Sequence, residues 1–215
     1  MSLVINAGIS GNNTRHLLER IDRDVLAHRP TLVVLKVGTN DALNSRALVP
    51  PEEHRRNLDT LCARLAPAAV LLLTPLPFHA GYHGSRHDPA AFSDAPPAER
   101  HRRIIANVRE VAAARRLPLV DLHAVLAGCG GAGEDAESLI RNPVNSGATD
   151  GVHPNAAGYR VIAAAVFAAI RAHALPTAVT VCFGDSITFG QYVDGEGTAA
   201  GGTYAGVLAR MLAAG

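Results

Sequence analysis

The sequence predicts an α/β fold, a three-layer α/β/α sandwich built on a five-stranded parallel sheet. Short apolar runs alternate with longer amphipathic runs along the 215 residues, which is typical of successive βαβ units. The runs richest in Val, Ile and Leu show little alternation, as expected for central strands buried on both faces. The length suits one domain over residues 1–215, and neither a repeat nor a domain boundary interrupts the alternation.

The individual elements follow from the same pattern. The candidate strands are Leu3–Asn6, Leu32–Val37, Ala69–Thr74, Leu117–Asp121 and Val179–Phe183. The candidate helices are Thr14–His28, Pro51–Arg64, Ala98–Arg115, Pro154–His173 and Tyr204–Ala213. In the fourth helix small apolar residues recur at helical spacing, and Pro154 suits a position in the first turn.

Two stretches break the alternation. Residues 75–97 are too long for an ordinary connection and are rich in Pro, Gly, His and Asp, which is typical of a lid or binding loop. Residues 128–148 are expected to form a solvated loop. Three histidines recur every four residues in the first stretch: His79, His83 and His87. Glycines and Pro89 argue against a helix that would gather them on one face, so no metal site is expected.

Composition excludes several classes of function. Hydrophobic residues make up 48% of the chain and charged residues 18%, and the net charge of +1 gives no reason to expect nucleic acid or an acidic membrane as a partner. Three widely spaced cysteines predict neither a disulfide framework nor a zinc site, and favour a reducing compartment. No leader and no membrane-spanning run is recognised, so a cytoplasmic protein is expected.

Two blocks carry residues suited to acyl transfer. The strand Val179–Phe183 runs into Gly184-Asp185-Ser186, which places a serine at the tip of a turn, where its own N–H also points toward a developing oxyanion. Upstream, Asp150 and His153 stand three apart, a spacing that lets the carboxylate orient the imidazole. Ser186 is the candidate nucleophile, His153 the base and Asp150 its orienting partner. Each block alone is equally typical of a capped turn.

Two further blocks follow predicted strands. Gly8-Ile9-Ser10-Gly11 comes after the first strand, and Gly38-Thr39-Asn40-Asp41 comes after the second. Read alone, both are ordinary turn or capping sequences. Lys36 and Asp41 flank the second block and are expected to pair at the surface. Four arginines in the third helix region are expected to lie on a solvated face: Arg100, Arg102, Arg103 and Arg109.

Together the four blocks resemble the SGNH (GDSL-type) hydrolase family, with a flavodoxin-like fold. The family normally carries its serine block first, whereas here Ser186 comes last, so the chain resembles a circular permutant. The resemblance implies a lipase- or esterase-like serine hydrolase whose oxyanion hole is formed by the N–H groups of Ser186 and Gly11 and the amide of Asn40. Gly8 is a weaker alternative to Gly11. It also implies that no cofactor is needed.

The expected substrate is a small molecule, an ester or thioester of a small to medium acyl group, hydrolysed through an acyl-enzyme. Carbohydrate O-deacetylation is an alternative from the same chemistry, although the aromatic content of 4% and the lack of Trp weaken it. A catalytically inactive binding protein is a second alternative, and the presence of all five site positions argues against it. The sequence leaves the oligomeric state open.

Overall fold

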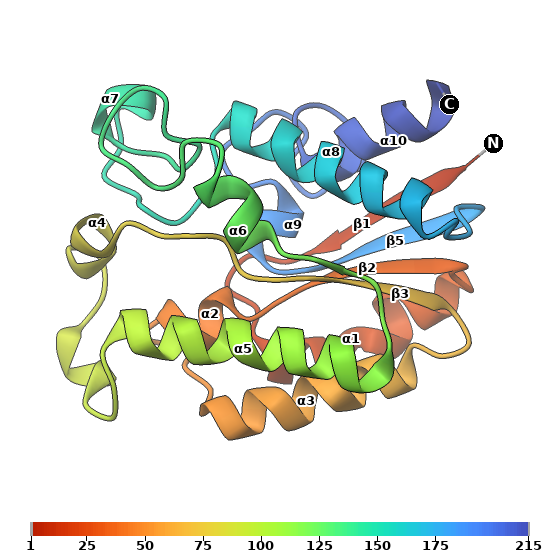
Figure 1. The fold of residues 1–215 in the computed structure, drawn as a ribbon, viewed down its shortest axis with the longest axis horizontal. Helices are drawn as coiled ribbons and strands as arrows, with labels where there is room; N and C mark the ends of the chain where they lie inside the picture. Colours follow the sequence, from red (N-terminus) through yellow and green to blue (C-terminus); the bar gives the residue numbers. More distant parts are fainter. Residues whose placement is uncertain (1, 215) are drawn as a thin grey trace.

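The computed structural model describes residues 2–214 and shows a parallel sheet between two helical layers (Figure 1). Its strands are β1 (Leu3–Gly8), β2 (Leu32–Lys36), β3 (Ala69–Leu73), β4 (Leu119–Val120) and β5 (Val179–Gly184). The strands lie in the order β1-β5-β2-β3-β4, and every neighbouring pair is parallel. The predicted five-stranded α/β sandwich is thereby confirmed.

All five predicted helices are present, although the first ends at Asp24 instead of His28 and the fourth begins at Ala156 instead of Pro154. The long helices are α1 (Thr14–Asp24), α3 (Pro51–Arg64), α5 (Pro97–Arg115), α8 (Ala156–Ala172) and α10 (Tyr204–Ala214). The short ones are η1 (Leu26–His28), α2 (Thr39–Leu43), α4 (Ala80–Gly84), η2 (Pro89–Phe92), α6 (Leu122–Ala127), α7 (Pro143–Ser146) and α9 (Ser186–Phe189). Within residues 2–214, none of them combines the length and apolarity that crossing a bilayer requires.

Pro154 does not begin a helix, contrary to the prediction. Asn155 caps α8 by accepting the N–H of Gly158 at 2.9 Å, and Pro154 instead forms an antiparallel bridge with Ile140. An Asn side chain at the cap satisfies a donor that would otherwise lack a partner. The bridge fixes the position of the residues just before α8, where His153 lies.

The sheet is covered on both faces by packed helices. Helices α6, α8 and α10 cover one face, and α1, α3 and α5 cover the other (Figure 1). The central strands are buried: every residue of β2 is inaccessible to solvent, and so is most of β5. Burial of a Leu, Ile or Val side chain stabilises the fold by roughly 1.5–3 kcal/mol. The rigid centre of the sheet therefore ends at the turns that follow β2 and β5.

The stretch 75–97 has more structure than predicted. It contains α4 and η2, although glycines and Pro89 were expected to prevent a helix there. The helix α4 is held by tertiary contacts: the N–H of His79 donates to the carbonyl of Gly151 at 2.8 Å, and His83 Nε2 donates to the carbonyl of Leu43 at 2.7 Å. Docking of this segment against neighbouring loops outweighs its weak helix propensity.

Two expectations about charged residues are wrong. Lys36 and Asp41 do not pair at the surface; both are fully buried, and Lys36 pairs with Asp185. Arg100 does not lie on a solvated face; it is 3% exposed, and its guanidinium pairs with Asp94 and donates to the carbonyl of Val49 at 2.9 Å. Each of these wrongly predicted residues is part of the packing around the carboxyl ends of the strands.

Candidate active site

Ser186 begins α9, directly after β5 (Figure 1). The side chain of Asp185 caps this short helix by accepting the N–H of Ile187 at 3.0 Å. Gly184 is required by close packing, because a Cβ there would lie 2.2 Å from the carbonyl oxygen of Lys36. The turn therefore holds Ser186 in one position at the carboxyl end of β5, where the residue is 7% exposed to solvent.

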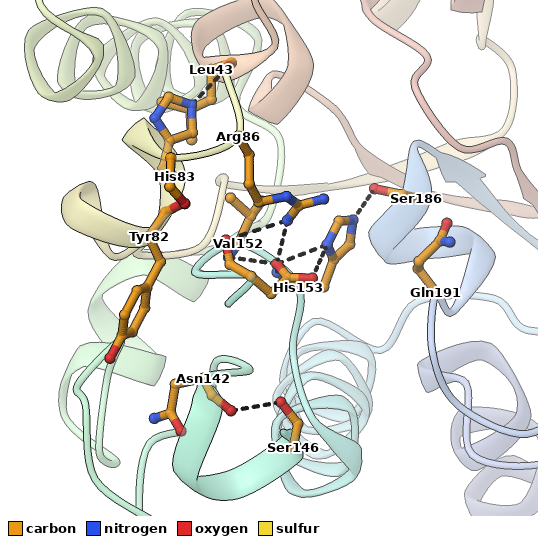
Figure 2. A network of polar contacts seen from close by, with 12 residues as sticks. Leu43, Tyr82, His83, Arg86, Asn142, Ser146, Val152, His153, Ser186 and Gln191 are labelled. Atoms are coloured by element: carbon orange, nitrogen blue, oxygen red, sulfur yellow. Dashed lines mark hydrogen bonds and ion pairs between the residues drawn. The ribbon is translucent and has the colours of Figure 1, made fainter. Parts of the chain in front are cut away.

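The turn 150–153 brings the imidazole onto the serine (Figure 2). His153 Nε2 lies 2.9 Å from Ser186 Oγ, and Nδ1 lies 3.0 Å from each oxygen of the Asp150 carboxylate. The backbone N–H groups of Val152 and His153 both donate to Asp150 Oδ1 at 2.9 Å. With Nδ1–H donating to the carboxylate, Nε2 is free to accept the serine proton.

The carboxylate of Asp150 is held in its charged form. Burial by itself raises the pKa of this carboxyl, but the hydrogen bonds from the His153 ring and from the two backbone N–H groups outweigh it, so that the pKa of Asp150 lies well below its usual range. Asp150 is therefore ionised throughout the pH range in which an esterase works.

Two side chains pack around the Asp–His pair. Arg86, which follows α4, places Nη1 3.0 Å from Asp150 Oδ1 and 3.3 Å from the Asp150 carbonyl (Figure 2). Tyr192 presents its ring edge-on to His153, with ring centroids 5.2 Å apart, and carries Arg141 on its face. Antiparallel bonds to the backbone of Arg141 fix the turn itself: its N–H donates to His153 and its carbonyl accepts from Gly151.

The predicted oxyanion donors lie beside Ser186. Gly11 has φ +80°, a left-handed conformation, and no atom lies within 4 Å of where its Cβ would be, so its backbone is open to an incoming substrate. Asn40 lies in the first turn of α2 and donates from Nδ2 to the carbonyl of Asn12 at 2.8 Å. Its Oδ1 accepts from Asn44 at 3.0 Å, which fixes the amide orientation.

The turn that carries Ser186 and the helix α2 that carries Asn40 are joined by a buried ion pair. Lys36, the last residue of β2, places Nζ 2.9 Å and 3.2 Å from the two oxygens of Asp185 and 2.5 Å from Thr39 Oγ1. The side chains of Lys36 and Asp185 are both 0% exposed. One ammonium group thus connects the residue before Ser186 with the residue before Asn40.

A second buried carboxyl, that of Asp41, joins helix α2 to the start of α1, just after the loop that contains Gly11. Asp41 Oδ1 accepts from the N–H of Thr14 at 3.1 Å and from its hydroxyl at 2.6 Å, while Asp41 Oδ2 has no partner among the described residues. Burial raises the pKa of Asp41 to about 6, although the Thr14 hydrogen bonds oppose the shift. Asp41 therefore connects the start of α1, which follows Gly11, to α2.

Arg20 completes this bracing from α1. Its guanidinium donates to the carbonyls of Ala7 and Gly184, at 2.9 and 2.8 Å, and to Asn12 Oδ1 at 2.7 Å. These acceptors lie at the ends of β1 and β5 and in the Gly11 loop. The buried guanidinium of Arg20 therefore links the end of β5, which leads to Ser186, to the loop that contains Gly11.

These residues open onto one cavity of about 220 Å³. Its lining residues are Ser10, Gly11, Thr39, Asn40, Leu43, Asn44, Arg86, His87, Val152, His153, Ser186, Gln191 and Tyr192. All five predicted site positions meet here: Gly11, Asn40, His153 and Ser186 in the cavity wall, and Asp150 behind His153. Across residues 2–214 no group of three or more His, Cys, Asp or Glu side chains is arranged to hold a metal ion.

Sequence reasoning missed the supporting residues. Lys36, Arg86 and Arg20 bond to residues of the site, yet the sequence analysis assigned none of them a supporting role. For Lys36 a signal does exist: it is the only lysine in the chain, at the end of an otherwise apolar strand, and a buried charge requires a partner. For Arg86 no comparable sequence signal exists.

Sequence comparison relates the chain to known hydrolases. The profile of the GDSL-like Lipase/Acylhydrolase family matches residues 1–161, a range that contains Gly11, Asn40, Asp150 and His153 and ends before Ser186. An acetylxylan esterase of Geobacillus stearothermophilus is 27% identical over 169 residues, which cover 75% of this chain and 69% of that protein.

Solved structures share the fold. A lipase/acylhydrolase from Enterococcus faecalis superposes with a TM-score of 0.61 at 24% identity, covering 78% of this chain and 74% of its own. An alpha/beta hydrolase enzyme from the metagenome of Lake Arreo, Spain, superposes with a TM-score of 0.55 at 30% identity, covering 74% and 68%.

Proposed function

The chain belongs to the GDSL-like lipase/acylhydrolase family and is a carboxylic ester hydrolase, and we propose that Ser186, His153 and Asp150 are its catalytic triad. The observation that carries the proposal is the continuous chain of contacts from Ser186 Oγ to His153 Nε2 at 2.9 Å and from Nδ1 to Asp150 at 3.0 Å. A serine hydroxyl becomes an effective nucleophile when a held base takes its proton.

Acylation proceeds as follows in this proposal. Ser186 Oγ bonds to the carbonyl carbon of the ester while its proton passes to His153 Nε2, and the carbonyl π electrons move onto oxygen. The N–H groups of Ser186 and Gly11 and the Asn40 amide stabilise that oxyanion. The tetrahedral intermediate collapses, the bond to the alcohol oxygen breaks, and His153 returns the proton to the leaving alcohol.

Deacylation repeats the sequence with water. His153 takes a proton from water, the hydroxide oxygen bonds to the acyl carbon, and the Ser186 oxygen leaves with the proton held by His153. The carboxylate of Asp150 stabilises the imidazolium in both half-reactions without accepting its proton. The products are the acid and the alcohol, and no cofactor takes part in any step.

We propose esters or thioesters of a small to medium acyl group as substrates. The cavity of about 220 Å³ lies below the 300–1,000 Å³ of typical ligand pockets, which favours a short acyl group. Deacetylation of a carbohydrate is the second candidate. It is favoured by the polar rim of the cavity, which includes Asn44, Arg86 and Gln191, and by the likeness to an acetylxylan esterase. The inactive-binder alternative does not explain the Ser–His–Asp contacts.

A panel of p-nitrophenyl esters from C2 to C12 tests this proposal. Turnover that peaks at C2 and extends to acetylated xylo-oligosaccharides supports the deacetylase, whereas a longer optimum supports the general esterase. Ser186→Ala is expected to lower kcat by roughly 10⁴–10⁶-fold while the fold persists. Turnover of Ser186→Ala within tenfold of the wild-type value, in a folded protein, would reject the assignment.

We also propose that the chain order is a circular permutation of the family order. When the strands are counted from β5, the order β1-β5-β2-β3-β4 becomes 2-1-3-4-5, the doubly wound flavodoxin-like order. Helix α10 then supplies the crossover from β5 to β1. The two described ends lie close together: Ser2 and Leu212 line the same surface cavity, and Figure 1 draws the start of β1 and the end of α10 next to each other at the right of the view.

Relinking the chain tests the permutation. A short Gly/Ser linker from residue 215 to Ser2, with a new start at Thr177, restores the usual order of blocks. Because the loop that it closes is short, its entropic effect on stability is small. The rearranged protein is expected to keep kcat within threefold of wild type; failure to fold, with native-like far-UV dichroism absent, would reject the permutation.

A further inference from the structure

A second cavity lies beside the catalytic cavity. It measures about 200 Å³ and lies between α4 and η2, with an apolar lining that includes Phe92 and the prolines Pro89, Pro96 and Pro97. Phe92 is buried, and its ring meets the ring of His83 edge-on, with centroids 5.7 Å apart. Nothing in the chemistry of the proposed triad uses this space.

One residue lines both cavities. His87 contributes to the wall of the catalytic cavity and also to the wall of the apolar cavity. Its ring stacks on that of His83, with centroids 4.5 Å apart and planes inclined by 27°. His87 Nδ1 accepts from the N–H of Ser45 at 3.3 Å and lies 3.2 Å from its hydroxyl. The imidazole is therefore fixed between the two spaces from two directions.

The stacked rings of His87 and His83 form a partition between the two cavities, and this partition is uncharged at neutral pH. Burial, together with the neighbouring His83, Arg86 and Arg46, lowers the pKa of His87 to about 4. The His83 ring donates to the carbonyl of Leu43, and burial lowers its pKa also. The residues that line the apolar cavity are neutral imidazoles, Phe92, prolines and Gly84, so an apolar chain inside it would displace water from no charged lining residue.

We propose that His87 is a specificity-determining residue whose imidazole closes the apolar cavity to the substrate and so restricts the enzyme to esters with a short arm. The proposal rests on the proposed function of the catalytic cavity. It names one substrate class for the wild-type enzyme, short-chain esters, and a second class, esters with an unbranched apolar arm of six to eight carbons, that an opened partition would admit.

Removing the ring tests the partition. The quantity measured is the ratio of kcat/KM for a C8 ester to that for a C2 ester. Two series distinguish which arm enters: p-nitrophenyl acetate against octanoate for the acyl arm, and ethyl acetate against octyl acetate for the alcohol arm. His87→Ala is expected to raise this ratio about tenfold or more in one series, because each methylene that gains an apolar contact favours the longer substrate.

Three control variants separate bulk from other effects. His87→Phe keeps a ring of similar size and is expected to keep the wild-type ratio, while His173→Ala, at the exposed end of α8, is expected to have no effect on it. Gly84 lines the apolar cavity and has open space around a Cβ, so adding Gly84→Leu to His87→Ala is expected to return the ratio toward wild type. His87→Ser provides the same opening if His87→Ala does not fold.

The outcomes are distinct. A ratio that stays at the wild-type value in both series, while acetate esters are still hydrolysed, overturns the partition and leaves the proposed function intact. An equal rise in His87→Phe also overturns it, because ring bulk would not be the cause. An absence of turnover for every ester in the wild type contradicts the proposed function instead.

Discussion

The proposed nucleophile, Ser186, and the proposed base, His153, reach the site from two regions of the molecule that differ in construction. Ser186 stands at the end of a central strand, above the ion pair of Lys36 and Asp185, whose side chains are both 0% exposed. His153 stands on a loop, and its partner Asp150 pairs with Arg86, whose side chain is 35% exposed. The first region is fixed by the core of the sheet, and the second by contacts between loops.

The two regions are expected to respond differently to the loss of an ion pair. We call the region around Ser186 the core half and the region around His153 the loop half. Breaking a buried ion pair leaves a charge in a medium that cannot solvate it, whereas breaking a half-exposed pair lets water take the place of the lost partner. In the loop half, two backbone N–H groups also remain bonded to Asp150 when Arg86 is removed. We therefore expect the loss of a buried charge in the core half to affect folding, and the loss of Arg86 in the loop half to affect rate.

Lys36→Met is expected to have the largest effect on stability. It leaves the Asp185 carboxylate buried without its cation, which is expected to lower the free energy of unfolding by about 3–5 kcal/mol. Urea unfolding measures it, with Arg64→Met as the control, because Arg64 pairs with the exposed Asp22 and its loss is expected to cost at most about 1 kcal/mol. If Lys36→Met and Arg64→Met lowered the free energy of unfolding equally, the buried ion pair would not stabilise the fold more than an exposed one.

Asn40→Ala tests whether the core half also supplies the oxyanion donor. It is expected to lower kcat by roughly 10²–10³-fold with KM little changed, because the amide acts only once charge develops on the substrate oxygen. Asn44→Ala is the matched control, since Asn44 is the neighbour that donates to Asn40 Oδ1, and a loss below tenfold is expected. A raised KM with kcat preserved would make Asn40 a ground-state contact.

Asp41→Asn tests whether the buried carboxyl of Asp41 makes the stability of the core half depend on pH. The folded protein holds the pKa of Asp41 at about 6, above the value of about 3.9 in an unfolded chain. Between these values the folded state binds more protons, so wild-type stability falls as pH rises from about 4 to about 6, by roughly 3 kcal/mol in total.

Asparagine cannot ionise and is expected to lack this fall. Urea unfolding of both proteins at several pH values isolates the contribution of position 41, because the two proteins differ only at that residue. A stability difference between wild type and Asp41→Asn that does not change between pH 4 and pH 7 would contradict the raised pKa.

Arg86→Gln gives the smallest expected effect and probes the loop half. It is expected to lower kcat roughly tenfold and to change the free energy of unfolding by less than about 1 kcal/mol, because solvent reaches the site of the lost guanidinium. Steady-state kinetics measures it, with the exposed Arg46→Gln as the control and Arg86→Lys as a partial rescue. A variant that unfolds would place Arg86 in the core half.

The sequence predicted the parts of the site that are local. Helix α3 was predicted with its observed bounds, Pro51–Arg64, since proline at its start and apolar spacing agree. The strand-end turns were also predicted, because each carries its glycine and polar residues in one short block. The family and the fold were recognised from these blocks.

The remaining features depend on contacts distant in the chain. Lys36 and Asp185 are separated by 149 positions and Arg86 and Asp150 by 64, so no local sequence pattern predicts either ion pair. Helix α4 was missed for the same reason: its stability comes from bonds to Leu43 and Gly151, which lie in other segments. Tertiary docking decided these cases against local propensity.

Covalent labelling tests the central claim, the Ser186–His153–Asp150 triad, most directly. A fluorophosphonate transfers its phosphonyl group to an activated serine and loses fluoride, and intact-mass and peptide mass spectrometry locate the adduct. One adduct is expected, on Ser186, and it should be absent from Ser186→Ala and form far more slowly in His153→Ala. An adduct on another residue, or labelling of Ser186→Ala at the wild-type rate, would contradict it.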